Sequence, residues 1–166
     1  MASKFSFLLP EYDELFQFAT IAEKLYFVDA SSSISKTRLV CEKLIALIGA
    51  FEEISLEGMV QFEKINHLSK LNILPDTVGS LFHMVRTSGN VASHHGYSTK
   101  EEALKILESA HKLLVWFYET YENDYIEDKS YFPTKPEETN AEVVELNSGA
   151  DGRGEADASA FLRGGL

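Results

Sequence analysis

A chain of 166 residues has room for one domain of ordinary size and a tail, and 45% of its residues are hydrophobic, enough for a sizeable core. The formal net charge is −11, and no stretch gathers the basic side chains that a phosphate backbone requires. The composition therefore argues against tight, non-specific DNA binding by this chain alone.

The acidic charge is concentrated in the last part of the chain. Residues 122–166 carry eleven acidic and four basic side chains, with two prolines and, from Ser148 onward, many Gly, Ala and Asp residues. A segment of this composition buries too little apolar surface to order itself. We therefore expect a folded domain over residues 4–121, followed by an acidic linker or disordered tail over residues 122–166.

Cysteine use and hydropathy indicate the compartment. The single cysteine, Cys41, lies within an apolar helical pattern, so we expect a buried, unreactive thiol and a reducing compartment. No apolar run approaches the roughly 20 residues that span a bilayer, and the first residues lack the apolar stretch of a signal peptide. These features predict a cytoplasmic protein without a membrane partner.

Apolar residues recur with helical spacing in five segments, and no segment alternates convincingly with a period of two residues. The first predicted helix begins at Pro10, which suits a first helical turn, and extends to Tyr26. The second covers about residues 33–48, and Gly49 is placed to end it. A third, weaker helix covers about residues 56–71, with an apolar stripe formed by Met59, Phe62, Ile65 and Leu68.

The fourth predicted helix follows Pro75 and reaches about Ser93. The fifth has the clearest start, because Ser98 and Thr99 each stand three residues before a glutamate, as in a capping box. It continues to Tyr121. The sequence thus predicts an all-α fold, a compact bundle of about five helices.

The fourth predicted helix has two chemically different faces. At about 100° per residue, one side is expected to face the core through Val78, Leu81, Val85, Ser88 and Ala92. The opposite side carries His83, Arg86, Asn90 and His94, and the last three stack along one line because they are four residues apart. Gly89 lies between the faces, where it permits a bend or the close approach of another backbone.

This polar face has two open interpretations. Helix faces in water usually carry Lys and Glu. A face with a single charge is instead typical of a surface that another helix or a second subunit covers. This structural role is the leading interpretation. The alternative is a ligand or catalytic site, in which His94 deprotonates a ribose 2′-hydroxyl and Arg86 stabilises the attacked phosphate. That chemistry needs no metal or other cofactor. His95 is a further candidate, although it points about 100° away from His94.

Five stretches together resemble a known family: residues 4–8, 22–29, 36–44, 85–94 and 110–118. They are similar to the helical domain of unknown function at the N-terminus of type I restriction enzyme R subunits and related helicase-like defence proteins. The most specific element is Gly89-Asn90-x-x-x-His94. That family in turn resembles a branch of the HEPN superfamily, helical bundles whose active members are metal-independent RNases with an Arg…His pair, often at a dimer cleft.

The resemblance implies a HEPN-like bundle with Arg86 and His94 as catalytic candidates, beside the binding candidates His83, Gly89, Asn90 and His95. Arg86 and His94 enclose seven residues, whereas active members usually have four to six. The chain also shows no phosphate-binding loop and no zinc-ligand spacing.

We therefore expect an accessory or interaction module of a restriction or defence system. Its expected partner is a protein, such as another restriction subunit, or nucleic acid, bound through the polar face of the fourth helix. One alternative is a metal-independent RNase or toxin, and the other is a purely structural dimerisation domain that forms a homodimer.

Overall fold

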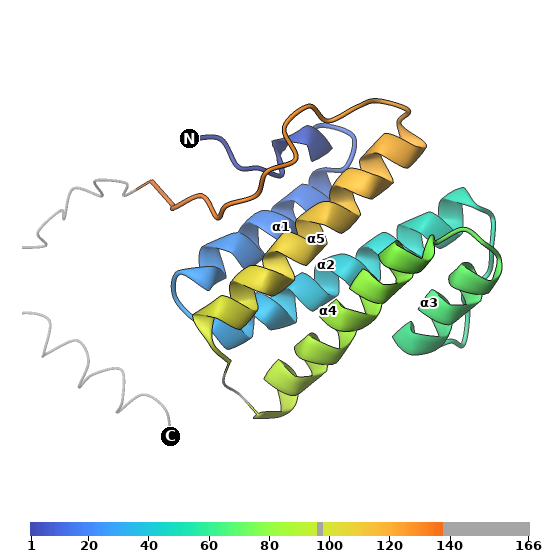
Figure 1. Cartoon of the computed structure of the whole chain (residues 1–166), viewed down its shortest axis with the longest axis horizontal. Coiled ribbons are helices and arrows are strands. Elements are labelled where there is room, and N and C mark those ends of the chain that lie inside the picture. The colour runs from blue at the N-terminus through green and yellow to red at the C-terminus, as the bar shows by residue number, and fades with distance from the viewer. Residues whose placement is uncertain (96–97, 138–166) are drawn as a thin grey trace, which may run out of the picture. The chain divides into compact units, whose positions relative to one another are not determined.

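The computed structural model describes the backbone of residues 1–95 and 98–137, and the side chains of these ranges except residues 89–95. Within these ranges it contains five α-helices, one short 3-10 helix and no strand (Figure 1). The prediction of an all-α fold is confirmed. The elements are η1 (Ser6–Leu8), α1 (Asp13–Tyr26), α2 (Ala30–Phe51), α3 (Gln61–Lys70), α4 (Asp76–His95) and α5 (Lys100–Tyr121).

Helix α2 is the centre of the bundle, because it contacts each of the other four α-helices. Helices α1, α5 and α4 lie alongside it, and the short helix α3 lies beside the first part of α4 (Figure 1). Leu44, Ile45 and Ile48 of α2 are fully buried. Cys41 on the same stripe is buried and unpaired, as expected, and burial raises the pKa of its thiol, so the thiol is unreactive.

Helix α2 begins three residues earlier and ends three residues later than predicted. Asp29 caps its start by accepting a hydrogen bond from the backbone N–H of Ser31 (3.1 Å). The prediction that Gly49 ends the helix is wrong, since the helix continues to Phe51. Gly49 serves close packing instead: a Cβ there would lie 2.6 Å from Cδ1 of Leu56, in the loop before α3.

Helices α1 and α3 are shorter than predicted. Helix α1 begins at Asp13 rather than Pro10, after a turn that follows η1. Helix α3 begins at Gln61, where Glu63 accepts a hydrogen bond from the backbone N–H of Val60 (3.1 Å). Within α3, Ile65 and Leu68 are buried as the apolar pattern predicts, because they face α2 and α4.

The start of α5 is the capping box predicted at Thr99. The Thr99 hydroxyl accepts from the backbone N–H of Glu102 (3.2 Å), and Glu102 accepts from the backbone N–H of Thr99 (2.9 Å). Thr99→Ala is expected to lower the free energy of unfolding by about 1 kcal/mol, measured by urea denaturation. Ser98→Ala, at the other predicted capping position, should change it by less than about 0.5 kcal/mol. Equal losses in both variants would contradict this assignment.

After α5 the chain turns back across the N-terminal segment (Figure 1). Residues up to Lys135 belong to the same compact unit as the helices. We call residues 126–135 the strap. Its Tyr131 packs against the core. Residues 138–166, the remainder of the predicted acidic tail, lie outside the described residues. None of the described helices is long and apolar enough to span a bilayer.

Candidate functional site

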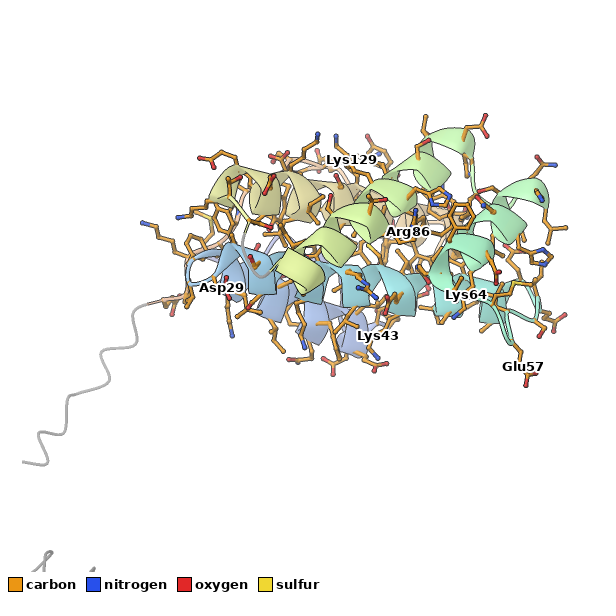
Figure 2. All side chains as sticks on the ribbon, turned by 90° about the horizontal axis from the view of Figure 1, so that it is seen from below. Asp29, Lys43, Glu57, Lys64, Arg86 and Lys129 are labelled. Atoms are coloured by element: carbon orange, nitrogen blue, oxygen red, sulfur yellow. The ribbon has the colours of Figure 1, made fainter. Side chains whose placement is uncertain are left out.

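His83 and Arg86, from the predicted polar face of α4, contact residues of α3. The opposite side of α4 enters the core through Val78, Phe82 and Val85, all buried. Arg86 lies on the side of α4 that is turned toward α3 (Figure 2). The helical spacing predicts Val78 and Val85 as core residues but not Phe82, because Phe82 stands next to His83 at the border of the two faces.

His83 uses both ring nitrogens within the bundle. Its Nε2 lies 2.9 Å from Oδ1 of Asn66 on α3, and its Nδ1 lies 3.4 Å from Nε of Arg86. An amide oxygen only accepts, so Nε2 carries the proton and donates, while Nδ1 accepts from the Arg86 guanidinium. The hydrogen bonds therefore fit a neutral imidazole. His83 acts here as a positioning residue between α3 and Arg86.

Arg86 is stacked on an aromatic ring of the neighbouring helix. Its Cζ lies 5.1 Å from the ring centroid of Phe62, and the Phe62 and His83 rings are 5.4 Å apart. Such cation–π contacts hold a guanidinium in place. Neither described contact uses the two terminal amino groups of Arg86. We call Phe62, Asn66, His83 and Arg86 the α3–α4 cluster.

Phe62 is the residue that sequence analysis misassigned. The helical spacing put it on the core stripe of the third helix, yet half of its surface (50%) is exposed. Since α3 begins only at Gln61, Phe62 stands in the first turn, at the edge of the packed stripe. No signal in the sequence distinguishes this ring from a core residue, because its exposure depends on where the helix begins.

Burial lowers the pKa of His83 below its ordinary value of 6.5, and the positive charge of Arg86 lowers it further. An NMR titration should therefore give a pKa below 6.5 for His83, and Arg86→Gln should move it back up. The folded-state pKa lies below that of the unfolded chain. The stability contributed by neutral His83 is thus present above about pH 6.5 and is lost as the pH falls through the folded-state value.

The matched control for this titration is Arg38→Gln, which removes a guanidinium on α2 that is paired with Glu42 (2.9 Å) rather than with His83. This variant should leave the His83 titration unchanged. A His83 pKa at or above 6.5, or an equal response to both arginine variants, would contradict the assigned contacts.

The remaining candidates lie outside the described side chains: Gly89, Asn90, His94 and His95. The backbone of α4 is helical through His95, so Arg86 and His94 are separated by a rise of about 12 Å along one helix. Among the described residues, no group of three or more His, Cys, Asp or Glu side chains is arranged to hold a metal ion.

Comparison with known proteins identifies the family of this helical domain. Residues 20–142 match the family described as Domain of unknown function (DUF4145), which covers all of α2 to α5 and the strap. The chain belongs to the DUF4145 family. The residues of the α3–α4 cluster all lie within the part of the chain that matches it.

The DUF4145 chain is also similar to the Type I restriction enzyme EcoKI endonuclease subunit of Escherichia coli (strain K12). The two are 29% identical over 124 residues, which are 74% of this chain and 10% of that subunit. The chain thus spans about a tenth of the length of this relative. No solved structure matches the chain.

Proposed function

We propose that this DUF4145 chain is an accessory, partner-binding domain of a type I restriction or related anti-phage defence system. Its binding surface is the face of α4 that carries His83, Arg86, Asn90 and His94, extended by Phe62 of α3. The similarity to a restriction endonuclease subunit supports the system. The α3–α4 cluster is the observation that carries the choice of surface.

A half-exposed aromatic ring beneath a guanidinium is typical of the residues that dominate protein interfaces. Aromatic and Arg side chains are enriched at such positions, and rigid ones lose little entropy on binding. Phe62 is fixed between His83 and Arg86. A groove of about 290 Å³ on α3, lined by Met59, Glu63, Asn66, His67 and Lys70, adjoins the cluster through Asn66. The cluster therefore offers a partner a preformed anchor beside a recess.

A protein partner fits this surface better than nucleic acid. A duplex-binding surface neutralises several phosphates with clustered Lys and Arg, whereas the chain carries a net charge of −11. On α4, Asp76 and Arg86 are the only Asp, Glu, Lys or Arg residues. The core of a protein interface typically has few charged residues but retains Arg and aromatic residues, as this surface does.

The test is binding of the purified chain to the other subunits of a type I restriction system from the same cell, measured by calorimetry. Phe62→Ala and Arg86→Ala should each weaken binding by about tenfold or more. Two matched variants serve as controls: Phe51→Ala, because Phe51 is 49% exposed against 50% for Phe62, and Arg38→Ala on α2. Equal losses in the controls would contradict the proposed surface.

The alternatives have distinct outcomes in two further assays. If the chain is a partner-binding domain, we expect total RNA to remain intact when it is incubated with the chain and EDTA. Cleavage that disappears in Arg86→Ala and His94→Ala would replace the proposal with a HEPN-type RNase. Light scattering that shows a wild-type dimer and an Asn90→Lys monomer would instead support a structural dimerisation domain.

The contacts of Arg86 favour the binding role over catalysis. Its Nε donates to His83 rather than facing an open site. His94 lies two helical turns further along α4, so one phosphate would have to bridge side chains whose backbones are about 12 Å apart. A catalytic pair in one protomer needs both groups within hydrogen-bond reach of the same reacting atoms.

A further inference from the structure

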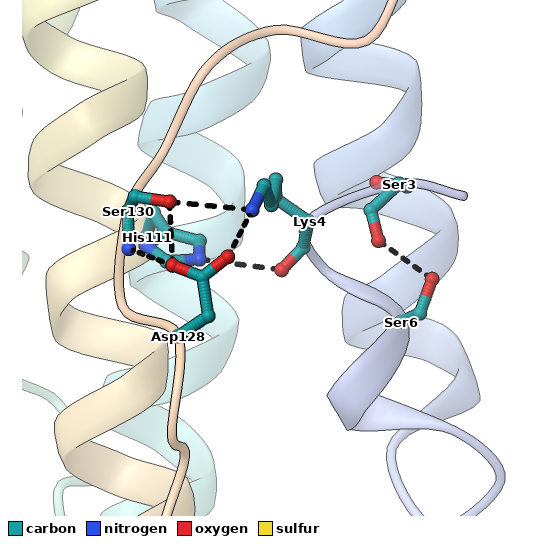
Figure 3. Close-up of polar contacts among 6 residues, drawn as sticks. All are labelled: Ser3, Lys4, Ser6, His111, Asp128 and Ser130. Atoms are coloured by element: carbon teal, nitrogen blue, oxygen red, sulfur yellow. Dashed lines mark hydrogen bonds and ion pairs between the residues drawn. The ribbon is translucent and has the colours of Figure 1, made fainter. Parts of the chain in front are cut away.

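The strap lies between the N-terminal segment and α5, and we call the space that it fills there the groove. Figure 3 shows the strap beside α5, with Lys4 of the N-terminal segment reaching toward it. Nζ of Lys4 bonds Oδ2 of Asp128 (2.6 Å) and Oγ of Ser130 (3.3 Å). The N-terminal segment and α5 thus form two walls, with the strap between them.

Tyr131 is the main anchor of the strap in this groove. Its ring lies 5.5 Å from the Phe5 ring and 5.0 Å from the His111 ring, and its hydroxyl donates to Glu23 of α1 (3.0 Å). Phe5, His111 and Glu23 are 0%, 1% and 3% exposed. The pocket for this one side chain therefore combines two tilted ring contacts with a carboxylate at its end.

The floor of the groove is held by contacts that do not involve the strap. His111 Nε2 donates to the backbone carbonyl of Lys4 (3.2 Å), and Ser3 donates to Glu23 (3.3 Å). The Phe5 ring also packs on His111 with a centroid distance of 5.6 Å. These contacts tie the N-terminal segment to α1 and α5, so the recognition groups keep their positions without Tyr131.

The strap itself is held by few strong contacts. None of the described backbone–backbone hydrogen bonds involves residues 126–135. Its two ion pairs, through Asp128 and Lys129, place side chains that are 65% and 45% exposed, and such surface pairs contribute little. Segments with these properties open locally before the core unfolds.

One buried group also disfavours the closed strap, and a second is satisfied by it. The hydroxyl of Thr134 is buried without a hydrogen-bond partner in the described structure, and an unpaired buried hydroxyl is costly. The Glu23 carboxyl is almost fully buried, but the Tyr131 hydroxyl and the backbone N–H of Thr134, both on the strap, donate hydrogen bonds to it. The closed state is thus held mainly by Tyr131 and by the hydrogen bonds of the strap to Glu23, against the penalty at the Thr134 hydroxyl.

We propose that this groove is a docking site for an extended segment of a protein partner, and that the strap is the resident segment which such a partner displaces. The fitting segment carries an acidic residue and, three positions later, a tyrosine. Lys4 receives the acidic residue, as it receives Asp128. Phe5 and His111 receive the tyrosine ring, and Glu23 accepts its hydroxyl, as they do with Tyr131.

This docking site is separate from the surface proposed above. The strap contacts the N-terminal segment, α1 and α5, whereas the α3–α4 cluster lies on α3 and α4. The strap is a covalently attached competitor for the groove. A partner segment binds only the molecules in which the strap is open, so its apparent affinity falls as the open fraction falls.

The probe is a fluorescein-labelled peptide of residues 126–135, titrated against the full chain by fluorescence anisotropy. Tyr131→Ala in the protein removes the resident anchor, so this variant should bind the peptide at least about tenfold more tightly than wild type. A peptide with Tyr131→Phe should bind more weakly, because it cannot donate to Glu23. Phe51→Ala, at a ring that is 49% exposed and whose described ring contacts are with Phe117 and Tyr121 rather than with the strap, is the control and should bind as wild type does.

Equal peptide affinity for wild type and Tyr131→Ala, or no binding to either while circular dichroism shows intact helices, would overturn the proposal. If Tyr131→Ala loses its helical signal, Tyr131→Phe in the protein replaces it, since this change keeps the buried ring and removes only the hydrogen bond from the Tyr131 hydroxyl to Glu23. Hydrogen exchange of wild type gives an independent result. Strap amides should exchange before those of α5, and simultaneous exchange of the two would overturn the proposal.

Discussion

Phe5→Ala is expected to lower the free energy of unfolding by about 3–5 kcal/mol, the usual loss when a fully buried phenylalanine is truncated. The ring is 0% exposed and contacts the rings of His111 and Tyr131. The variant therefore leaves a cavity where the N-terminal segment, α5 and the strap meet. Urea denaturation at equilibrium measures the loss, which is large beside a typical total stability of about 5–15 kcal/mol.

Phe132→Ala is the matched control, since this neighbouring ring is 43% exposed and its described ring contact is with Nζ of Lys4 (4.6 Å). We expect a loss below about 1 kcal/mol. A loss for Phe5→Ala as small as that of the control would show that the N-terminal segment is not part of the folding unit.

Tyr131→Phe is expected to destabilise the domain by about 1–3 kcal/mol at neutral pH, because a buried carboxylate loses one of its hydrogen-bond donors. The Tyr131 hydroxyl, the Ser3 hydroxyl and the backbone N–H of Thr134 all donate to Glu23. Burial raises the pKa of Glu23, and these donors lower it in part. Removing one donor therefore raises that pKa further.

The effect of Tyr131→Phe on the free energy of unfolding should depend on pH. Tyr131 stabilises the ionised form of Glu23, so the difference between wild type and Tyr131→Phe is present above the pKa of Glu23 and shrinks as the pH falls below it. Urea denaturation over this pH range measures the effect. Tyr125→Phe, at an exposed ring, should show no loss at any pH. A constant loss at all pH values would contradict the role of the ionised carboxyl.

Periodicity in the sequence predicts the helices well where one stripe is buried along their whole length. The capping box at Thr99 is confirmed because reciprocal side-chain bonds to the first turn are local and do not depend on packing. Helix ends set by tertiary contacts were missed. Gly49 was predicted as a terminator, whereas its neighbour in space is Leu56, which no local pattern reveals.

The candidate site could be predicted only in part. His83 and Arg86 follow from helical geometry and lie together as expected, with Arg86 Nε 3.4 Å from the ring nitrogen. Their partners Phe62 and Asn66 come from another helix, so their roles depend on how α3 packs on α4. The pocket of Tyr131 is formed by three segments that are far apart in the sequence. Residues so widely separated form no motif with a recognisable spacing.

Gly49 also has a consequence for the distant binding surface. The short loop that begins beside Gly49 leads directly into α3, and Leu56 rests against the bare Cα of this glycine. A methyl group at position 49 would force the Leu56 side chain to move, in the loop that leads to the first turn of α3, where Phe62 stands. Gly49→Ala therefore tests whether packing on the central helix helps to set where α3 begins, and with it the position of the Phe62 ring.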